Sequence, residues 1–364
     1  MFLRKLTVKN LRCIENLELE TQDRLNMLLG SNAQGKSTIL EAVFLICTSK
    51  SFRTGRDREL INADSDYALV SAEADRDKRN PVKIELALMR NKPKSLRIDG
   101  VVKNRIPDLF GEINCVVFSS EDVALLRGEP KYRRHYLNLD ISQLYPSYAV
   151  KYGEYKKVLL QRNTLLKEMA ENPGKYPKDF LQIYDEKAAK TGAYLISKRL
   201  EYTQKLFTYA REFYKSIIHS EKAEFAYYST VKYASPEPEE IERSMLAQLE
   251  ERRESDIQNK TTGIGPHRDD LTVSVDGAPV KISGSAGQQR CCALSLKLAQ
   301  IYLIYDIAGE YPVVLLDDFA SELDRERQKR ALDAARDNCQ CFITATHIDR
   351  EEGRVFSVDR GRLV

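Results

Sequence analysis

The chain has 364 residues, and its 57 lysines and arginines nearly balance 54 aspartates and glutamates, which leaves a net charge of +3. This length predicts a substantial core and two domains, and the balanced charge means that any nucleic-acid surface must arise from local clustering. The N-terminus lacks the apolar core of a signal peptide, and apolar runs stay below the roughly 18 residues of a membrane span, so we expect a cytoplasmic protein with no membrane partner. The cysteines form no Cys-x-x-Cys pair, so we expect no zinc site.

Short strands and turns dominate the first part of the chain, to about residue 118. Asp99-Gly100 is a two-residue hairpin turn signal inside LRIDGVVKNR. Apolar spacing predicts further strands or hairpins at 3–19, 25–29, 84–88 and 113–118.

The Asp-Gly hairpin and the turn before it carry a group of basic residues. These are Lys92, Lys94, Arg97, Lys103 and Arg105. Phosphate groups of DNA would satisfy such a cluster, so these residues are the DNA-binding candidates. A solvated surface with no partner is the open alternative.

Residues 30–43, GSNAQGKSTILEAV, contain the pattern Gly-x-x-x-x-Gly-Lys-Ser between an apolar strand and a helical repeat. This P-loop pattern predicts ATP binding: the glycines let backbone N–H groups surround a phosphate, Lys36 reaches the β- and γ-phosphates, and Ser37 offers its hydroxyl to Mg²⁺. The ATP-binding candidates are Gly30, Ser31, Asn32, Ala33, Gln34, Gly35, Lys36, Ser37 and Thr38.

From about residue 121 to 260, apolar residues recur at helical intervals and tyrosine, lysine and glutamate are frequent. Breaks fall at Asn172-Pro173-Gly174 and in the SPEPEE stretch at 235–240. This texture predicts a helical domain, and the lack of a sustained heptad argues against a long coiled coil.

The strand pattern returns at 271–282, and a glycine-containing turn, SGSAGQQR, then leads into a long apolar helix that we expect to begin after Gln289. PVVLLDD, 312–318, reads as a central parallel strand ending in two carboxylates. Asp317 is the candidate metal ligand beside Ser37, and Asp318 is the candidate catalytic base for the attacking water.

The P-loop and the acidic strand are about 280 residues apart, far more than a compact P-loop core needs. A helical insertion explains the distance. We therefore predict an α/β fold: an ATPase head with a mixed sheet, formed by residues 1–120 and 263–364, and an inserted helical arm formed by residues 121–262.

The order of these motifs resembles the ABC-type ATPase heads of the SMC and Rad50 group, and their details resemble the RecF family of bacterial recombination mediators. The motifs that carry the likeness are GSNAQGKSTILEAV, SFRT at 51–54, FSSED with Gly-Glu-Pro and Arg133-Arg134, GPHRDDL at 265–271, GQQR at 287–290 and LLDDFASELD. GPHRDD read alone is typical of a structural segment of turns and salt bridges, with a DNA or interdomain role as the open alternative.

The resemblance implies roles for further residues. Ser285, Gly287 and Gln288 would form a signature that contacts the γ-phosphate held by a second subunit. Asp324 would be the D-loop aspartate at the dimer seam, and His347 or Thr346 would be the catalytic switch residue. Asn32 and Lys36 would help to hold the γ-phosphate.

The chain departs from the family pattern at three places: Ala286, Phe52 and Ser120 replace the glutamine, histidine and proline expected there. No glutamine lies between Ser119 and Asp122, where the Q-loop equivalent would be. These differences leave the residue of the Q-loop metal contact open, but remove no group that phosphate binding needs.

The resemblance implies an ATP- and Mg²⁺-dependent homodimeric clamp on double-stranded or gapped DNA. It would hydrolyse ATP slowly, with stimulation by DNA, and act with RecR and RecO to help load RecA during recombinational repair, DNA replication and the SOS response. The alternatives are the soluble ATPase subunit of a membrane transporter, which is usually shorter and has a Q-loop glutamine, and a nucleotide-gated scaffold that does not hydrolyse ATP.

Overall fold

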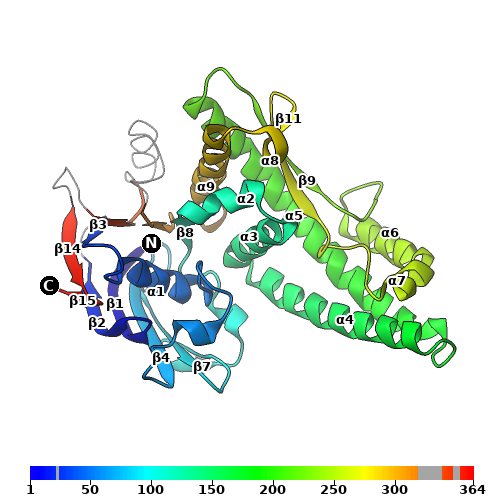
Figure 1. The fold of residues 1–364 in the computed structure, drawn as a ribbon, viewed down its shortest axis with the longest axis horizontal. Helices are drawn as coiled ribbons and strands as arrows, with labels where there is room; N and C mark the ends of the chain where they lie inside the picture. The colour runs from blue at the N-terminus through cyan, green and yellow to red at the C-terminus, as the bar shows by residue number, and fades with distance from the viewer. Residues whose placement is uncertain (22–23, 319–337, 347–352) are drawn as a thin grey trace.

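The structure is a computed structural model that describes residues 1–21, 24–318, 338–346 and 353–364. Two sheets and the helix between them form one end of the molecule, and a long helical part forms the other end (Figure 1). The predicted α/β class is confirmed.

The first sheet is antiparallel and has six strands in the order β2-β1-β4-β5-β6-β7. Its strands are β1 (Phe2–Leu11), β2 (Ile14–Glu20), β4 (Tyr67–Asp75), β5 (Val82–Met89), β6 (Ser95–Ile98) and β7 (Val101–Lys103). β5 alternates between buried and more exposed residues, as its sequence predicts for a strand with one face on a core. Asp99 and Gly100 have φ of +51° and +77°, the left-handed values that a tight hairpin turn requires, so the predicted hairpin is confirmed.

The second sheet also has six strands, in the order β15-β14-β3-β13-β12-β8. They are β3 (Leu25–Leu29), β8 (Cys115–Phe118), β12 (Val313–Leu316), β13 (Cys341–Ala345), β14 (Arg354–Asp359) and β15 (Arg362–Leu363). All neighbours pair in parallel except β14 and β15. β8 and β12 are buried at every position, which is why their sequences are continuous apolar runs.

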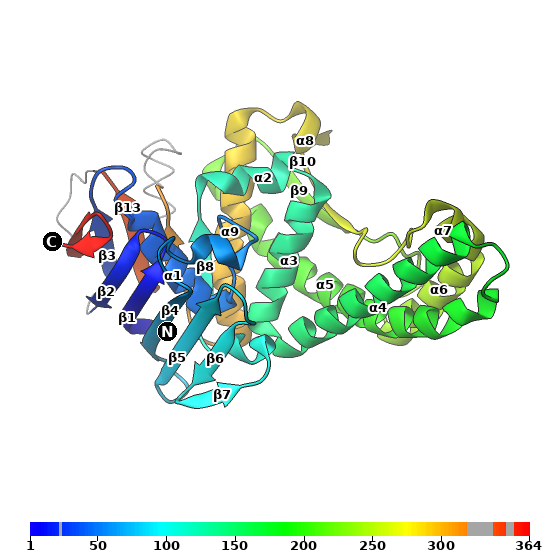
Figure 2. The same cartoon turned by 60° about the horizontal axis from the view of Figure 1, so that its bottom comes forward.

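Helix α1 (Lys36–Thr48) lies between the two sheets and contacts strands of both (Figure 2). All its residues except Ser37 are buried. This position explains why the helix is apolar all round instead of on one face. Because β3, β12 and β13 are parallel neighbours, their carboxyl ends meet at one edge of the sheet, beside the start of α1.

The helical part contains most of the remaining elements: α2 (Ala124–Arg127), α3 (Pro130–Leu144), α4 (Pro146–Glu171), α5 (Gln182–Ile217), α6 (Pro238–Glu251), α7 (Arg253–Asn259), α8 (Val280–Ser283) and α9 (Ala286–Ala308). Short 3-10 turns, η1 to η4, occur at Asp57–Leu60, Ile106–Leu109, Ser120–Val123 and Lys178–Leu181. α4 and α5 run side by side away from the sheets (Figures 1 and 2).

The segment 121–262 is helical as predicted, apart from the strand β9 (Ala223–Tyr228), which helical periodicity did not indicate. β9 pairs with β10 (Asp270–Val275), and β10 pairs with the short β11 (Ala278–Pro279). A boundary at residue 262 therefore separates two paired strands, and the domain limits remain a prediction.

Helix α9 packs on β8 and α5. It is the single helix in the described residues that is long and apolar enough to cross a membrane by length and composition, but 72% of that apolar window is buried inside the protein. The core helix of a soluble protein has this same pattern.

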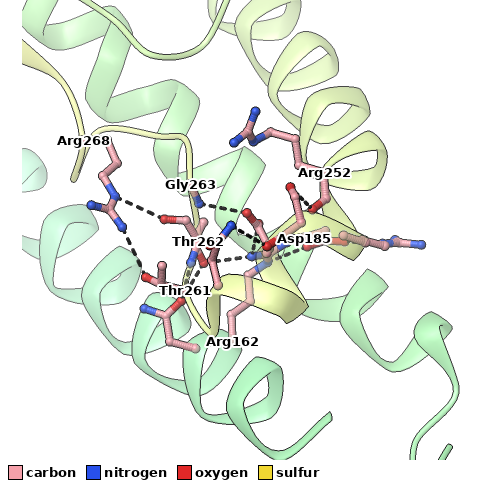
Figure 3. A network of polar contacts seen from close by, with 12 residues as sticks. Arg162, Asp185, Arg252, Thr261, Thr262, Gly263 and Arg268 are labelled. Atoms are coloured by element: carbon pink, nitrogen blue, oxygen red, sulfur yellow. Dashed lines mark hydrogen bonds and ion pairs between the residues drawn. The ribbon is translucent and has the colours of Figure 1, made fainter. Parts of the chain in front are cut away.

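A buried polar network braces the helical part (Figure 3). The Arg162 side chain is fully buried and donates to Asp185 at 2.7 Å, Asp256 at 2.8 Å and Thr262 at 2.8 Å. Arg253 donates to the second oxygen of Asp185 at 2.8 Å. Charges buried so completely are tolerated because each has a partner of opposite sign or a hydrogen bond.

The GPHRDD segment also forms polar contacts that hold the helical part together. The Tyr155 hydroxyl lies 2.7 Å from His267 Nδ1, and Asp270 receives two bonds from Arg133 at 2.6 and 2.8 Å. Asp269 accepts from the hydroxyls of Thr230 and Tyr227. These contacts favour the structural interpretation of the segment, which connects β10 to helices α3 and α4.

Candidate nucleotide-binding site

The P-loop connects β3 to α1, as its pattern predicts, and its two glycines are required by close packing. A Cβ atom on Gly30 would lie 2.3 Å from the Val358 carbonyl oxygen. Gly35 has φ of +101°, and a Cβ there would lie 3.1 Å from Cys13 Sγ and 3.2 Å from Gly361 Cα. The loop is therefore held between the β1–β2 turn and the C-terminal hairpin, a constraint that the motif alone does not reveal.

Lys36 lies across this loop. Its Nζ donates to the carbonyl oxygens of Gly30 at 2.6 Å and Ser31 at 2.7 Å. Burial lowers the pKa of Lys36, while Asp318 and Asp317 nearby act to raise it. The side chain is thus ordered and lies near the two carboxylates of the acidic strand.

Ser37 and Asp317, which are 280 residues apart in the chain, meet at the carboxyl edge of the second sheet. Ser37 Oγ donates to Asp317 Oδ1 at 2.7 Å. Thr344 Oγ1 donates to the same oxygen at 2.9 Å, and the Asp318 N–H donates to Thr344 Oγ1 at 2.8 Å. A hydroxyl and a carboxylate this close are the ligands expected of a magnesium site.

No group of three or more His, Cys, Asp and Glu in the described part of the chain could hold a metal ion. A metal at Ser37 and Asp317 would therefore need further oxygen ligands, which the phosphates of a nucleotide and water supply in Mg²⁺ sites of this kind. The donor set fits a metal that arrives with its nucleotide.

A cavity of about 320 Å³ opens beside the P-loop. Among the predicted site residues, Asn32, Ala33 and the exposed Asp318 line this cavity. It is also lined by residues that were not predicted as site residues: Arg12, Cys13, Thr344 and Arg53, which belongs to the SFRT motif. Thr346, one of the two candidates for the switch residue, lies there too.

The two arginines are held by a carboxylate within α1. Glu41 is fully buried and receives bonds from Arg12 Nε at 2.6 Å and Arg12 Nη2 at 2.9 Å. The Arg53 guanidinium is 4.0 Å from Glu41, and Ser51 also donates to Glu41. Glu41 therefore fixes two positive charges at the wall of the cavity, where a polyphosphate would be attracted.

Gln34 belongs to the P-loop, but its side chain serves another contact. Its Oε1 accepts from the Arg360 N–H at 2.7 Å, and its carbonyl accepts from the Gly361 N–H at 2.8 Å. The side chain thus attaches the P-loop to the turn between β14 and β15.

The signature residues lie at the start of α9. The helix begins at Ala286, so the expectation of a start after Gln289 is wrong. Ser285 caps the helix by accepting from the Gln288 N–H at 3.1 Å, and Gln288 Oε1 accepts from the Ser285 N–H at 2.9 Å. This reciprocal capping box satisfies donors that would otherwise be free, which allows the earlier start.

The start of α9 does not reach the P-loop of its own chain. Ser285, Gly287 and Gln288 are absent from the residues that line the cavity, as far as the structure describes them. Both views place α8 and the start of α9 well apart from α1 (Figures 1 and 2). Ser285 is exposed, while Gln288 also donates to Glu221 at 3.1 Å.

Two predicted site residues, Asp324 and His347, lie outside the described residues. Their roles remain predictions.

The DNA candidates separate into two groups. Lys92 and Arg97 are exposed and Lys103 is half-buried. Arg105 is exposed but forms an ion pair with Asp108 at 3.2 Å.

Lys94 is unlike the others, because it is 11% exposed and pairs with Asp57 at 2.8 Å. Its Nζ also donates to the Ser49 carbonyl, and burial lowers its pKa. Lys94 is therefore engaged inside the protein in this structure, which argues against a direct DNA contact.

Comparison with known proteins places this chain in a family. Residues 2–352 match the RecF/RecN/SMC N-terminal domain. The chain is 36% identical to the DNA replication and repair protein RecF of Clostridium perfringens, over 100% of this chain and 99% of that protein. A solved structure of the recombination mediator RecF with ATP, from the RecFOR pathway, matches with a TM-score of 0.93 and 33% identity, covering 100% of this chain and 97% of that one. An Smc head bound to the winged-helix domain of ScpA shares the fold, with a TM-score of 0.56 at 14% identity.

Proposed function

The chain belongs to the RecF family within the RecF/RecN/SMC group, and from this premise we propose that it is an ATP-driven clamp on DNA in recombinational repair. ATP would bring two copies together, the closed dimer would hold double-stranded or gapped DNA, and slow hydrolysis would release it. The chain's relatives are named for DNA replication and repair, and a solved RecF structure contains ATP. A transporter subunit is not favoured, because the relatives match along the whole chain.

ATP binding is supported by the P-loop geometry. Backbone N–H groups from residue 30 onward and the start of α1 would surround the β-phosphate, and Lys36 would exchange its carbonyl partners for phosphate oxygens. Arg12 and Arg53 would add charge at the cavity wall. Ser37 and Asp317 would hold Mg²⁺, which neutralises charge on the β- and γ-phosphates when bound.

Hydrolysis is supported by Asp318. Its side chain follows the buried strand β12, is exposed to the P-loop cavity and lies near Lys36. A carboxylate there can orient a water and accept its proton as the water attacks the γ-phosphate.

The observation that carries the dimer is the position of the signature. Ser285 is exposed at the start of α9, apart from the cavity of its own chain. The start of a long helix favours an anion, so this end of α9 suits the γ-phosphate of a second copy. A two-fold dimer would then contain two composite sites, each with one chain's P-loop and the other chain's signature.

DNA would be held by phosphate contacts, for which Lys92, Arg97, Lys103 and Arg105 are the accessible candidates. We further propose a cytoplasmic role with RecR and RecO, and indirectly with RecA. The matching RecF structure is from the RecFOR pathway, which supports the part played with RecR and RecO.

Two substitutions of Ser285 by residues of nearly equal shape test the composite site. Both Ser285→Asp and Ser285→Asn keep a good helix cap, but only aspartate places a negative charge against the γ-phosphate. Sedimentation at saturating ATP should show a dimer for the parent and Ser285→Asn and a monomer for Ser285→Asp, while all three bind ATP with similar affinity. A Ser285→Asp protein that dimerises like the parent would exclude this architecture.

A further inference from the structure

We propose that Thr344 is a positioning residue that sets both carboxylates of the acidic strand for ATP hydrolysis, a role that rests on the proposed function. Thr344 lies on β13, the strand next to β12, and is 1% exposed. Its hydroxyl forms hydrogen bonds with both members of the Asp317-Asp318 pair.

The direction of the hydrogen bonds is fixed by chemistry. The Asp318 N–H can only donate, so Thr344 Oγ1 accepts from it at 2.8 Å. A hydroxyl has one proton, and the carboxylate oxygen of Asp317 can only accept, so that proton points to Asp317 Oδ1 at 2.9 Å. The hydroxyl therefore joins the backbone of one aspartate to the side chain of the other, with no freedom to rotate.

The backbone needs this support where the ladder ends. β12 pairs with β13 up to Leu316 and Ile343, and the Asp317 N–H donates to Phe118 on β8 at 2.9 Å. At Asp318 the chain turns out of the sheet with φ of +50°, a left-handed value that is unfavourable for an L-residue with a Cβ. The Thr344 hydroxyl takes the place of a ladder carbonyl for the Asp318 N–H, and so stabilises the turn.

The turn decides where the Asp318 carboxylate points, because its Cβ direction follows from the backbone. Asp317 is shared between Ser37 on one side and Thr344 on the other. If Ser37 turns its hydroxyl to a bound ion, the bond from Thr344 still holds Asp317. Loss of the Thr344 hydroxyl would therefore misplace the catalytic group while leaving the P-loop donors to ATP unchanged.

Thr344→Val removes the hydroxyl with little change of shape, and Thr344→Ser keeps it. Thr203→Val is a matched control, because Thr203 is also buried and donates 2.7 Å to a backbone carbonyl, but in α5. We expect kcat for ATP hydrolysis to fall about 10- to 100-fold in Thr344→Val, since small misplacement of a catalytic group costs up to about 10²-fold. Thr344→Ser and Thr203→Val should stay within about 3-fold of the parent, and the Kd for ATP should stay within about 3-fold in all three.

A second measurement needs no turnover. Hydrogen exchange of the peptide that contains Asp318 should be faster in Thr344→Val than in Thr344→Ser or the parent, because its amide loses its acceptor.

The inference is overturned if the parent hydrolyses ATP and Thr344→Val has the same kcat, or if Thr344→Ser is as slow as Thr344→Val. An equal loss in Thr203→Val would also overturn it, because the effect would then be general destabilisation. A parent that binds ATP without hydrolysing it overturns the proposed hydrolysis itself, and with it any catalytic role of Thr344.

Discussion

Arg162→Met should destabilise the helical part of the protein strongly. The guanidinium is fully buried and compensates the buried carboxylates of Asp185 and Asp256. Methionine fills similar space but carries no charge. Removal of one partner from a buried ion pair typically costs about 3–5 kcal/mol, mostly because the other charge is left without compensation.

The contacts that remain place the expected loss near the lower end of that range. Asp185 keeps Arg253 at 2.8 Å, and Asp256 keeps the Gly263 N–H at 3.1 Å. We therefore expect the free energy of unfolding to fall by about 3 kcal/mol. Asp256→Asn combined with Arg162→Met should recover part of this loss, because it removes the uncompensated charge.

Urea unfolding, followed by the circular dichroism of the helices, measures this effect. The slope m should be the same for the variant and the parent. Lys167→Met is the matched control, since Lys167 is on the same helix α4 but exposed, and its replacement should change stability by less than about 0.5 kcal/mol. A loss below about 1 kcal/mol in Arg162→Met would refute the reasoning. It would mean that the two carboxylates are neutral or hydrated without their arginine.

Four further outcomes are expected. Lys36→Ala should weaken ATP binding about 10- to 100-fold, because the lost amine is a charged donor to the phosphates, and it should leave thermal unfolding unchanged. Calorimetric titration measures the Kd for ATP, and an unchanged Kd would contradict the assignment of Lys36 to the ATP site. Asp318→Asn should retain ATP and slow phosphate release by about 10² or more, whereas release at the parental rate would remove Asp318 from catalysis. Burial lowers the pKa of His267 from 6.5 to about 4, so between these pH values the unfolded state binds a proton that the folded state does not. The free energy of unfolding should therefore fall by up to about 3 kcal/mol as pH drops from 6.5 to 4, and it should fall less in His267→Gln. If Lys92 and Lys103 contact DNA phosphates, replacing both with Ala should reduce the slope of log K against log salt by about 1.8, and an unchanged slope would exclude this hairpin.

Local sequence determined the elements around the site. The glycine spacing of the P-loop, the apolar runs of β8 and β12 and the Asp99-Gly100 turn each depend on backbone preferences within a few residues. The order of the motifs was enough for the family, because it reaches across the whole chain. These features needed no knowledge of which distant segments meet.

The partners of particular side chains were decided by the tertiary structure. Lys94 was predicted as a DNA contact by its position in a basic cluster, but it pairs with Asp57, which lies at the start of η1, 37 residues earlier in the chain. Gln34 was predicted as an ATP-binding residue by its place in the P-loop, and it lines the cavity, but its side chain also accepts a hydrogen bond from the Arg360 N–H in the C-terminal turn. Sequence proximity cannot report such contacts, because each depends on where another element passes.

Thr344 shows the same limit inside the active site. In the sequence it is one threonine in an apolar strand, CFITA, with no motif to mark it. It gains its contacts because parallel pairing aligns the ends of β12 and β13, so that its hydroxyl meets the Asp317 carboxylate and the Asp318 N–H, more than 25 residues away in the chain. The residue types and their local spacing thus determined the chemistry that the chain can perform. Strand order and register determined which side chains are close enough to take part, because hydrogen bonds act only over about 3 Å.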